Sequence, residues 1–244
     1  MAENAVRERR RAETVREIEE AALAQLAEVG PGGLSLRGVA RTVGMTVQSI
    51  YHYFPSRDAL LTALVAGAHH ALADAVQAAA DASRGRPPTE RRRATTSAFR
   101  TWSLTHRAEF LLLYGTPVPG FAPLPEGGTV EAALRLATPF AETVFDGWTA
   151  DELAALPPAP GAEALAGTGP TGIPLPPGAL AFFLELRARM HGMVTLELLG
   201  HLQPLQDHAE ELFAAMLHRM ATEIDVEHAR ARERLRRESD TPRG

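Results

Sequence analysis

The stretch LSLRGVARTVGMTVQSIYHYFPSRDALL, residues 34–61, decides the fold of the N-terminal part of the chain. Ser35 is a suitable N-cap for a short helix, Gly44 interrupts that helix, and Thr46 is an N-cap for a second helix that ends near Phe54. Two short helices joined by a turn that contains glycine are typical of a helix-turn-helix motif. The pattern therefore predicts such a motif, in which the second helix presents side chains to DNA bases.

One face of the second helix is apolar. Ile50 shares this face with Tyr53 and Phe54, so we expect it to pack in a core. The first helix supplies the facing surface, namely Leu36, Val39, Ala40 and Val43.

The other directions of the second helix carry side chains that can contact DNA. Gln48 and Ser49 can hydrogen-bond to base edges, and Val47 can contact a thymine methyl group. His52 points in the same general direction. Tyr51 and Tyr53 carry hydroxyls that can reach phosphate.

The rest of the chain shows helix signals and almost no strand signals, so the fold class is expected to be all-α. The expected helices span about residues 11–29, 57–82, 89–106, 108–114, 130–148, 179–202 and 206–236. Residues 115–128 are expected to be a loop, and the Pro/Gly-rich residues 156–178 a loop or a partly disordered linker. We expect a three-helix DNA-binding domain at 1–56, a larger helical domain at 57–236 and a charged tail at 237–244.

Composition restricts the possible functions. Cysteine is absent, which excludes disulfides, thiol redox chemistry and cysteine-based zinc sites. No run of 18 apolar residues and no signal peptide are recognisable, so we expect a cytoplasmic protein with no membrane partner. The net charge of −5 argues against coating of nucleic acid through bulk positive charge. A local basic arm, Arg7–Arg11, follows either the minor groove or phosphates, or it is a solvated helix start.

Residues 34–61 closely resemble the DNA-binding signature of the TetR family of bacterial transcriptional regulators. In that signature, G-x-(S/T)-x-x-x-(L/I)-Y-x-(H/Y)-F is followed by a capped helix that begins with Lys or Arg. The matching residues are Gly44, Thr46, Ile50, Tyr51, Tyr53, Phe54 and Arg57. The resemblance implies a homodimer with an N-terminal three-helix DNA-binding domain and a helical C-terminal domain that binds a small ligand and dimerises.

The resemblance also implies a role for each residue of the motif. Carried over by position, Val47, Gln48, Ser49 and His52 would read bases. Thr46, Tyr51, Tyr53 and Arg57 would hold phosphates of a double-stranded DNA operator.

A second segment, RMHGMVTLELLGHL at residues 189–202, resembles the core of a C-terminal domain of many actinobacterial members, named for a Trp-His-Gly tripeptide. In those members it is often preceded by a segment like YGTPVPGF, here residues 114–121. This chain has Met190 where the tripeptide has Trp.

The last two expected helices have wide apolar faces. These faces carry Phe183, Leu186, Met190 and Met193 on one helix and Leu212, Met216, Met220 and Ile224 on the other. Faces of this width can pack against their own domain and a partner at once, so we expect a homodimer through a four-helix bundle, as the family resemblance implies.

Aromatic and neighbouring residues of the larger domain are candidates for a small-molecule pocket. These are Trp102, Phe110, Tyr114, Phe140, Phe145, Phe183, Met190 and His191. Such pockets are mostly apolar, which favours an apolar or aromatic effector. Aromatic residues at helical spacing also occur as plain core, so that reading stays open for each of them.

Catalytic and cofactor sites are not expected. Residues 167–172 satisfy GxGxxG by spacing, but they lie in the Pro-rich segment with no strand before them, so we expect no nucleotide cofactor. The histidines lack the spacing of a metal set, and no nucleophile with a base or pair of acids is recognisable. The sequence thus favours a ligand-responsive repressor that binds a palindromic operator as a homodimer and is released by a small molecule. A helical-bundle enzyme and a DNA-binding protein without effector control remain as alternatives.

Overall fold

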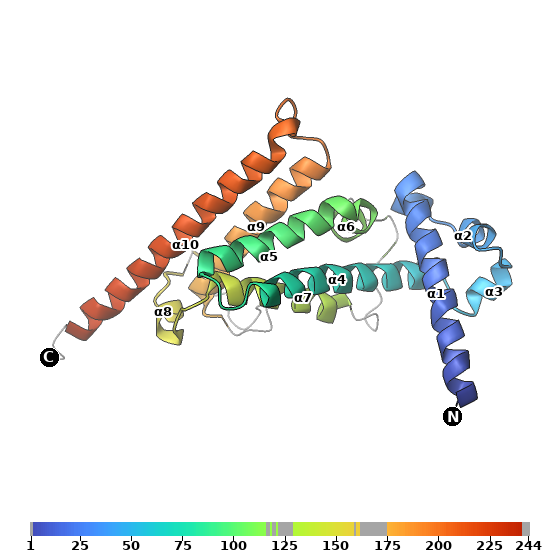
Figure 1. Ribbon diagram of the computed structural model, residues 1–244, viewed down its shortest axis with the longest axis horizontal. Helices are drawn as coiled ribbons and strands as arrows, with labels where there is room; N and C mark the ends of the chain where they lie inside the picture. The colour runs from blue at the N-terminus through green and yellow to red at the C-terminus, as the bar shows by residue number, and fades with distance from the viewer. Residues whose placement is uncertain are drawn as a thin grey trace. The chain divides into compact units, whose positions relative to one another are not determined.

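The computed structural model describes residues 2–115, 118, 121, 129–158, 160–161 and 175–240, and within these it contains helices and no strand, which confirms the all-α class (Figure 1). In chain order the helices are α1 (Ala2–Val29), α2 (Leu36–Thr42), α3 (Val47–Tyr51), α4 (Arg57–Ala82), α5 (Pro88–Thr105), α6 (Arg107–Tyr114), α7 (Thr129–Val144), α8 (Ala150–Ala154), α9 (Pro177–Leu198) and α10 (Ala209–Asp240). Short 3-10 turns occur at Pro31–Gly33 and Gln206–His208.

The chain divides into two compact units, which are described separately. The first consists of Met1–Ala71 with Thr105–Ala132, and the second of Leu72–Leu104 with Ala133–Gly244. The division falls within α4, so this helix belongs partly to each unit. The functional boundary expected at residue 56 stays a prediction.

The first unit has a core in which α1, α2, α3 and the start of α4 meet. Ile18 of α1, Val39 of α2, Ile50 of α3 and Leu60 of α4 are all fully buried in one apolar cluster. The face that the sequence predicted for Ile50 and Phe54 is therefore confirmed as core. α1 begins at Ala2, earlier than expected, because Arg, Glu and Ala are all good helix formers.

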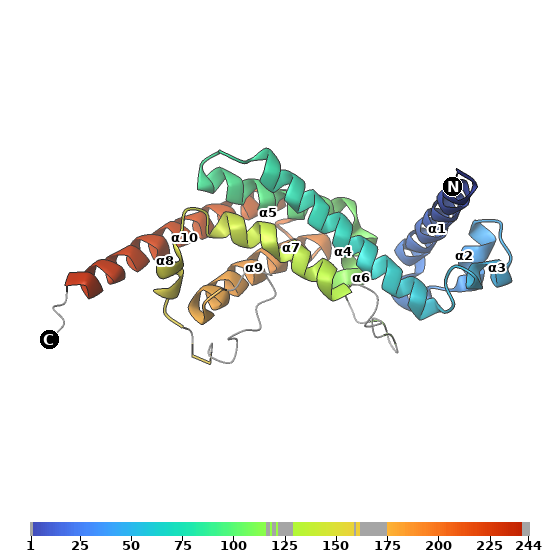
Figure 2. The same ribbon diagram turned by 90° about the horizontal axis from the view of Figure 1, so that it is seen from below.

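The second unit is a bundle in which α9 and α10 run side by side, as Figure 2 also shows. Its fully buried side chains include Phe99, Leu136, Phe183 and Leu186. The last turns of α4 join this core, where Leu72 and Val76 are fully buried.

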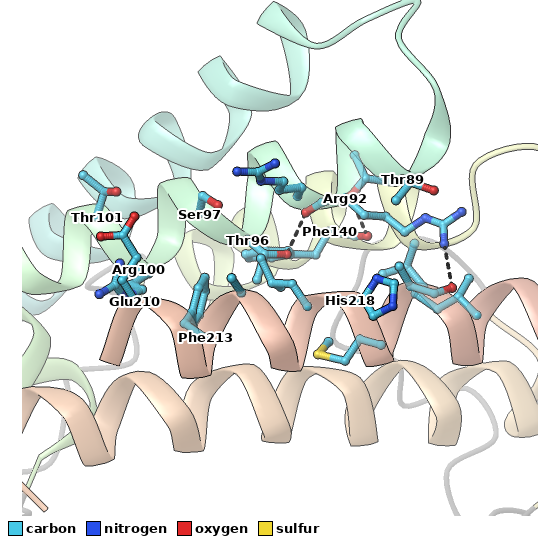
Figure 3. A pocket seen from close by; sticks show the side chains of 18 residues that line it. Thr89, Arg92, Thr96, Ser97, Arg100, Thr101, Phe140, Glu210, Phe213 and His218 are labelled. Carbon is cyan, nitrogen blue, oxygen red and sulfur yellow. Dashed lines mark hydrogen bonds between the residues drawn. The ribbon is translucent and has the colours of Figure 1, made fainter. Parts of the chain in front are cut away.

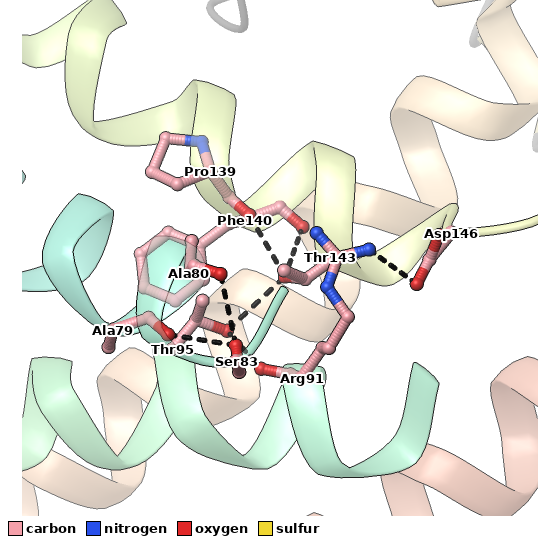
Figure 4. Close-up of polar contacts among 9 residues, drawn as sticks. All are labelled: Ala79, Ala80, Ser83, Arg91, Thr95, Pro139, Phe140, Thr143 and Asp146. Carbon is pink, nitrogen blue, oxygen red and sulfur yellow. Dashed lines mark hydrogen bonds and ion pairs between the residues drawn. The ribbon is translucent and has the colours of Figure 1, made fainter. Parts of the chain in front are cut away.

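A buried polar cluster ties α5 to α7 (Figure 4). The hydroxyls of Thr95 and Thr143, both fully buried, lie 3.2 Å apart. The Thr143 hydroxyl also donates to the carbonyl of Pro139, the proline inside α7, at 2.9 Å. At the edge of the cluster, Arg91 donates to Asp146. Buried hydroxyls with partners of this kind avoid the cost of unsatisfied polar groups.

The C-terminal end of α7 differs from the sequence-based expectation. The helix ends at Val144 rather than near Trp148, because Gly147 adopts a φ of 81° that favours glycine and ends the helical path. A short helix that was not expected, α8, follows. It starts with a capping box in which Thr149 and Glu152 each bond to the other's backbone amide.

Glu152 also fixes α8 to α10. Its carboxylate accepts hydrogen bonds from the Thr149 amide at 2.7 Å and from Arg232 Nε at 2.7 Å, and it lies 3.0 Å from His228 Nε2. The His228 ring stacks on Trp148, with ring centroids 4.3 Å apart. Burial by itself would raise the pKa of Glu152, but these hydrogen bonds outweigh burial and lower the pKa to about 2.

The last two helices also differ from their expected bounds. α9 begins at Pro177 and ends at Leu198, since Gly200 has a φ of 74° and the His201 amide donates back to the Leu196 carbonyl. α10 continues to Asp240, which includes residues 237–240 of the stretch expected to be a charged tail. Most of the linker expected at 156–178, including the GxGxxG spacing at 167–172, lies outside the described residues.

Among the described residues, α4 is long and apolar enough to cross a membrane by length and composition alone. Half of its most apolar 18-residue window is buried inside the protein. A core helix of a globular protein meets the same criterion, and the buried Leu60, Leu64 and Leu72 fit that description.

Candidate nucleic-acid interface

The Gln25 side chain of α1 holds α2 in place by accepting a hydrogen bond at the start of α2. Ser35 caps α2 by accepting a hydrogen bond from the Gly38 amide at 3.1 Å. The Ser35 amide itself donates to Gln25 Oε1 of α1 at 2.9 Å. A Cβ on Gly38 would lie only 2.1 Å from Gln25 Nε2, so the glycine lets the two helices approach closely.

The turn between α2 and α3 is a Schellman motif. The Met45 amide donates to the Ala40 carbonyl at 2.9 Å, and the Gly44 amide donates to the Arg41 carbonyl at 3.4 Å. Gly44 has a φ of 68°, which a residue with a side chain rarely adopts. The position of glycine in the sequence is thus explained by the geometry that directs α3 away from α2.

α3 is short and is anchored at both ends. Thr46 caps it by accepting from the Ser49 amide at 3.1 Å, which confirms the predicted N-cap. The Thr46 hydroxyl also lies 2.8 Å from the Ser49 hydroxyl. The helix ends at Tyr51 rather than near Phe54, and His52 is its C-cap. Fully buried Ile50 holds its inner face in the core.

The side chains expected to read bases differ in exposure. Gln48 and His52 are exposed, whereas Val47 and Ser49 are partly buried. Val47 packs against the apolar core, a role that the sequence reading did not assign to it. Gln48 and His52 are therefore the side chains of this group that are most available to a DNA groove.

The residues expected to hold phosphates are placed as follows. Thr46 is exposed at the start of α3, and Tyr51 has 46% of its surface exposed. Tyr53 is partly buried, and the guanidinium of Arg11 lies 5.1 Å from its ring centroid. Arg57 donates from Nε to the Leu34 carbonyl at 3.0 Å, so part of its guanidinium supports the loop before α2.

Two arginines were missed as members of this surface. Arg37 and Arg41 are exposed on α2, the helix that precedes α3, whereas Arg11, which lies over the Tyr53 ring, belongs to the basic arm already considered as a DNA contact. Their positive charge next to the recognition motif was the available signal in the sequence.

The second unit contains a pocket of about 470 Å³ between α5, α7 and α10 (Figure 3). Phe140 lines it, and Phe140, Phe183 and Met190 also line a space of about 20 Å³ that shares Thr96, Phe140, Val144 and Met220 with the larger pocket. Three of the predicted pocket residues are thus brought together.

The other candidate pocket residues lie elsewhere. Trp102 and Phe145 are buried in the second unit but do not line this pocket, whereas Phe110 and Tyr114 belong to the first unit. The sequence reading missed the polar wall of the pocket, which includes Arg92, Arg93, Thr96 and Arg100 of α5. Arginines on a helix look like a solvated face when read without the packing.

His191 packs beside Phe99, with ring centroids 5.5 Å apart. Burial, followed by the positive charge of Arg187, lowers the pKa of His191 to about 4, so the ring is neutral near pH 7. Within the described ranges, no group of three or more His, Asp and Glu side chains is arranged to hold a metal ion.

The fold and this surface define a helix-turn-helix protein, and comparisons with known proteins agree. The model for bacterial regulatory proteins of the tetR family matches residues 18–64. The model for the tetracyclin repressor-like C-terminal domain matches residues 92–220, more than half of the chain. The chain belongs to the TetR family of DNA-binding transcriptional regulators. The Trp-His-Gly subtype stays a prediction.

Two curated relatives are the HTH-type transcriptional regulators Rv1816 of Mycobacterium tuberculosis and Mb1846 of Mycobacterium bovis. Each is 39% identical over 123 residues, which are 50% of this chain and 52% of the relative. The matched region therefore spans about half the length of these relatives.

Solved structures resemble the chain over most of its length. The regulatory protein SCO4313 is 28% identical, with a TM-score of 0.73 and coverage of 87% of this chain and 97% of that one. PfmR, a TetR family transcriptional regulator from Thermus thermophilus, is 15% identical, with a TM-score of 0.54 and coverage of 82% and 97%. The second likeness concerns the fold alone.

Proposed function

We propose that the protein is a ligand-responsive repressor that binds a palindromic operator as a homodimer in the cytoplasm. The observation that carries the proposal is α3, a capped helix anchored in the core by Ile50 with Gln48 and His52 exposed on its outer side. A helix with a buried anchor and exposed hydrogen-bonding side chains is suited to the major groove. The regulatory names of the relatives support this reading.

Operator binding tests the proposal directly. The chain is titrated against a fluorescent DNA fragment taken from beside its own coding region, and against a scrambled fragment of the same composition. Gln48→Ala is expected to weaken specific binding by about 1–3 kcal/mol and to leave non-specific binding nearly intact. Glu28→Ala, an exposed change on α1, is the control variant. Equal loss on both fragments would refute base reading by Gln48.

The homodimer is supported by a groove between α9 and α10. Its volume is about 570 Å³, and its lining includes Met193, Leu196, Leu212 and Met216. Leu196 has 44% of its surface exposed, and Met193, Leu212 and Met216 are partly buried. Solvent-accessible apolar side chains that gather along two adjacent helices are typical of a protein interface. Packing of this face against a second copy would form a four-helix bundle around a two-fold axis.

Control by a ligand would pass through α4. This helix begins directly after the helix-turn-helix and continues without a break to Ala82. In the second unit its Asp74 pairs with Arg135 of α7, the helix that carries Phe140 and Thr143 at the pocket. A ligand that moves α7 would therefore tilt α4 and change the spacing of two recognition helices, which must be about 34–36 Å or a multiple to fit DNA.

Thermodynamic reciprocity gives a test of this control. A ligand that releases the protein from its operator must itself bind more weakly, by the same factor, when operator is present. Ligand affinity measured by calorimetry with and without operator should therefore differ by that factor. Identical affinities for a ligand that releases DNA would rule out coupling through α4.

A further inference from the structure

The pocket of the second unit has two different walls. One wall is the face of α5 with Arg92, Arg93 and Thr96, and the other is the face of α10 with Phe213, Leu217 and Ile224. Figure 3 shows Phe213 and Phe140 between Arg100 and Glu210 on one side of the pocket and Arg92 on the other. Its volume of about 470 Å³ lies within the range of small-molecule sites, roughly 300–1,000 Å³. A ligand that fits both walls has a polar and an apolar side.

The two ends of the pocket differ in the charge of the side chains that line them (Figure 3). At one end, Arg100 donates from Nε and Nη2 to the buried carboxylate of Glu197, and Glu210 adds a further negative charge. An anion is not favoured there, because the two carboxylates of Glu197 and Glu210 face a single guanidinium and leave the local charge negative.

The other end is formed by Arg92 and Arg93. The Arg92 side chain is only 10% exposed, and its Nη1 and Nη2 both donate to the same oxygen of Asp225, at 3.0 Å. Its Nε–H is buried and has no hydrogen-bond partner among the described residues. A buried donor without an acceptor is destabilising, so a ligand acceptor at this position would be stabilising.

Arg93 adds a second positive charge at this end. It is exposed and forms no ion pair within the part of the chain that the structure describes. A guanidinium that has no acidic partner can pair with an anionic head group.

We propose that this pocket binds an amphipathic organic anion, with its carboxylate, sulfonate or phosphate head at Arg92 and Arg93 and its apolar body along Phe213 and Leu217. The proposed function supplies the role of this ligand as effector, and the inference names its chemical class. The sequence favoured an apolar or aromatic effector; the proposed ligand keeps an apolar body and adds an anionic head group.

The test uses two probes with the same aromatic body. 8-Anilinonaphthalene-1-sulfonate carries an anionic head, and N-phenyl-1-naphthylamine lacks it. Both are titrated into the full chain without DNA, and binding is followed by probe fluorescence. The sulfonate probe is expected to bind about tenfold or more tightly than the neutral one, as one charge-assisted hydrogen bond predicts.

Two variants locate the head group. Arg92→Gln is expected to weaken binding of the sulfonate probe about tenfold, and Arg93→Gln, an exposed change that leaves the fold intact, about threefold. Binding of the neutral probe should change less than about twofold in both variants. Arg84→Gln, which removes an exposed arginine of the second unit that lines neither the pocket nor the α9–α10 groove, is the matched control and should affect neither probe.

Three results would overturn the proposal: equal affinity of the two probes, an equal loss of affinity for both probes in Arg92→Gln and Arg93→Gln, or a loss of affinity for the sulfonate probe in Arg84→Gln. Operator binding is measured separately with the same samples. A protein that discriminates the probes through Arg92 but binds no operator would support the ligand class and refute the proposed function.

Discussion

The ion pair between Arg100 of α5 and Glu197 of α9 offers the sharpest test of how the second unit is held together. Arg100 Nε and Nη2 donate to the two carboxylate oxygens of Glu197 at 2.7 and 2.5 Å. The side chains are 18% and 7% exposed. The Arg100 guanidinium also lies 5.2 Å from the ring centroid of Phe213 on α10. This contact therefore joins three helices.

Glu197→Ala would leave the Arg100 guanidinium in its largely buried place without its partner. Removal of one member of a fully buried pair costs about 3–5 kcal/mol. Because Arg100 keeps 18% exposure and can recover some hydration, we expect about 2–3 kcal/mol here. The double variant Arg100→Met with Glu197→Met replaces both charges by apolar groups, and we expect its free energy of unfolding to lie within about 1 kcal/mol of the wild-type value.

The free energy of unfolding is measured from urea titrations followed by circular dichroism, at one protein concentration for all variants. Glu90→Ala, which removes the exposed partner of Arg86 in an i, i+4 pair, is the control and should cost less than about 0.5 kcal/mol. A cost below about 1 kcal/mol for Glu197→Ala would refute the reasoning. The single variants Arg100→Met and Glu197→Met complete the comparison. A double variant whose loss of unfolding free energy equals the sum of the losses of these two single variants would also refute the reasoning, because that result would show no coupling.

Three further predictions concern DNA, assembly and pH. Arg57→Ala should weaken specific and non-specific DNA binding alike and lower the salt slope by about one unit, and an unchanged slope would remove Arg57 from the phosphate contacts. Met216→Glu places a charge in the α9–α10 groove and should convert a dimer at micromolar concentration to a monomer by light scattering; a wild type that is already monomeric would contradict the interface. The pKa of Glu152 is depressed in the folded state, so its stabilising contribution is complete above about pH 4.5 and is lost as the pH falls toward 2. Glu152→Gln should flatten unfolding stability over that pH range, and an unchanged pH profile would show that its bonds to Arg232 and His228 do not stabilise the fold.

Some of the differences from the sequence reading have local causes. The end of α7 and the extra helix α8 follow from Gly147 and from the capping box of Thr149 and Glu152. These signals were present in the sequence, but a continuous apolar pattern from residue 130 to Trp148 obscured them. Boundaries of this kind depend on single residues whose effect is smaller than that of the apolar period.

The candidate pocket residues show a different limit. Aromatic residues at helical spacing indicate a buried face, but they do not say which other helix covers it. Phe140, Phe183 and Met190 meet in the second unit, whereas Phe110 lies in the core of the first unit. The partners of a buried side chain depend on contacts between distant segments, which no local pattern contains.

The sequence alone determined the helix-turn-helix, because its signals act within one turn of backbone. The caps at Ser35 and Thr46 each bond to an amide three residues ahead, and Gly44 supplies the positive φ between them. The bounds of α4 at Arg57 and Ala82 agree with those predicted from the sequence.

Only the tertiary structure decided the character of the candidate pocket in the second unit. In the sequence, Arg92 is one of three consecutive arginines and looks solvated. In the fold, α10 packs on α5 and brings Asp225, 133 positions away in the chain, to within 3.0 Å of its guanidinium. Burial of that charge follows from the packing of two helices that meet only after the chain has folded, and this is why residue patterns could predict the DNA-binding motif but not the charged wall of the pocket.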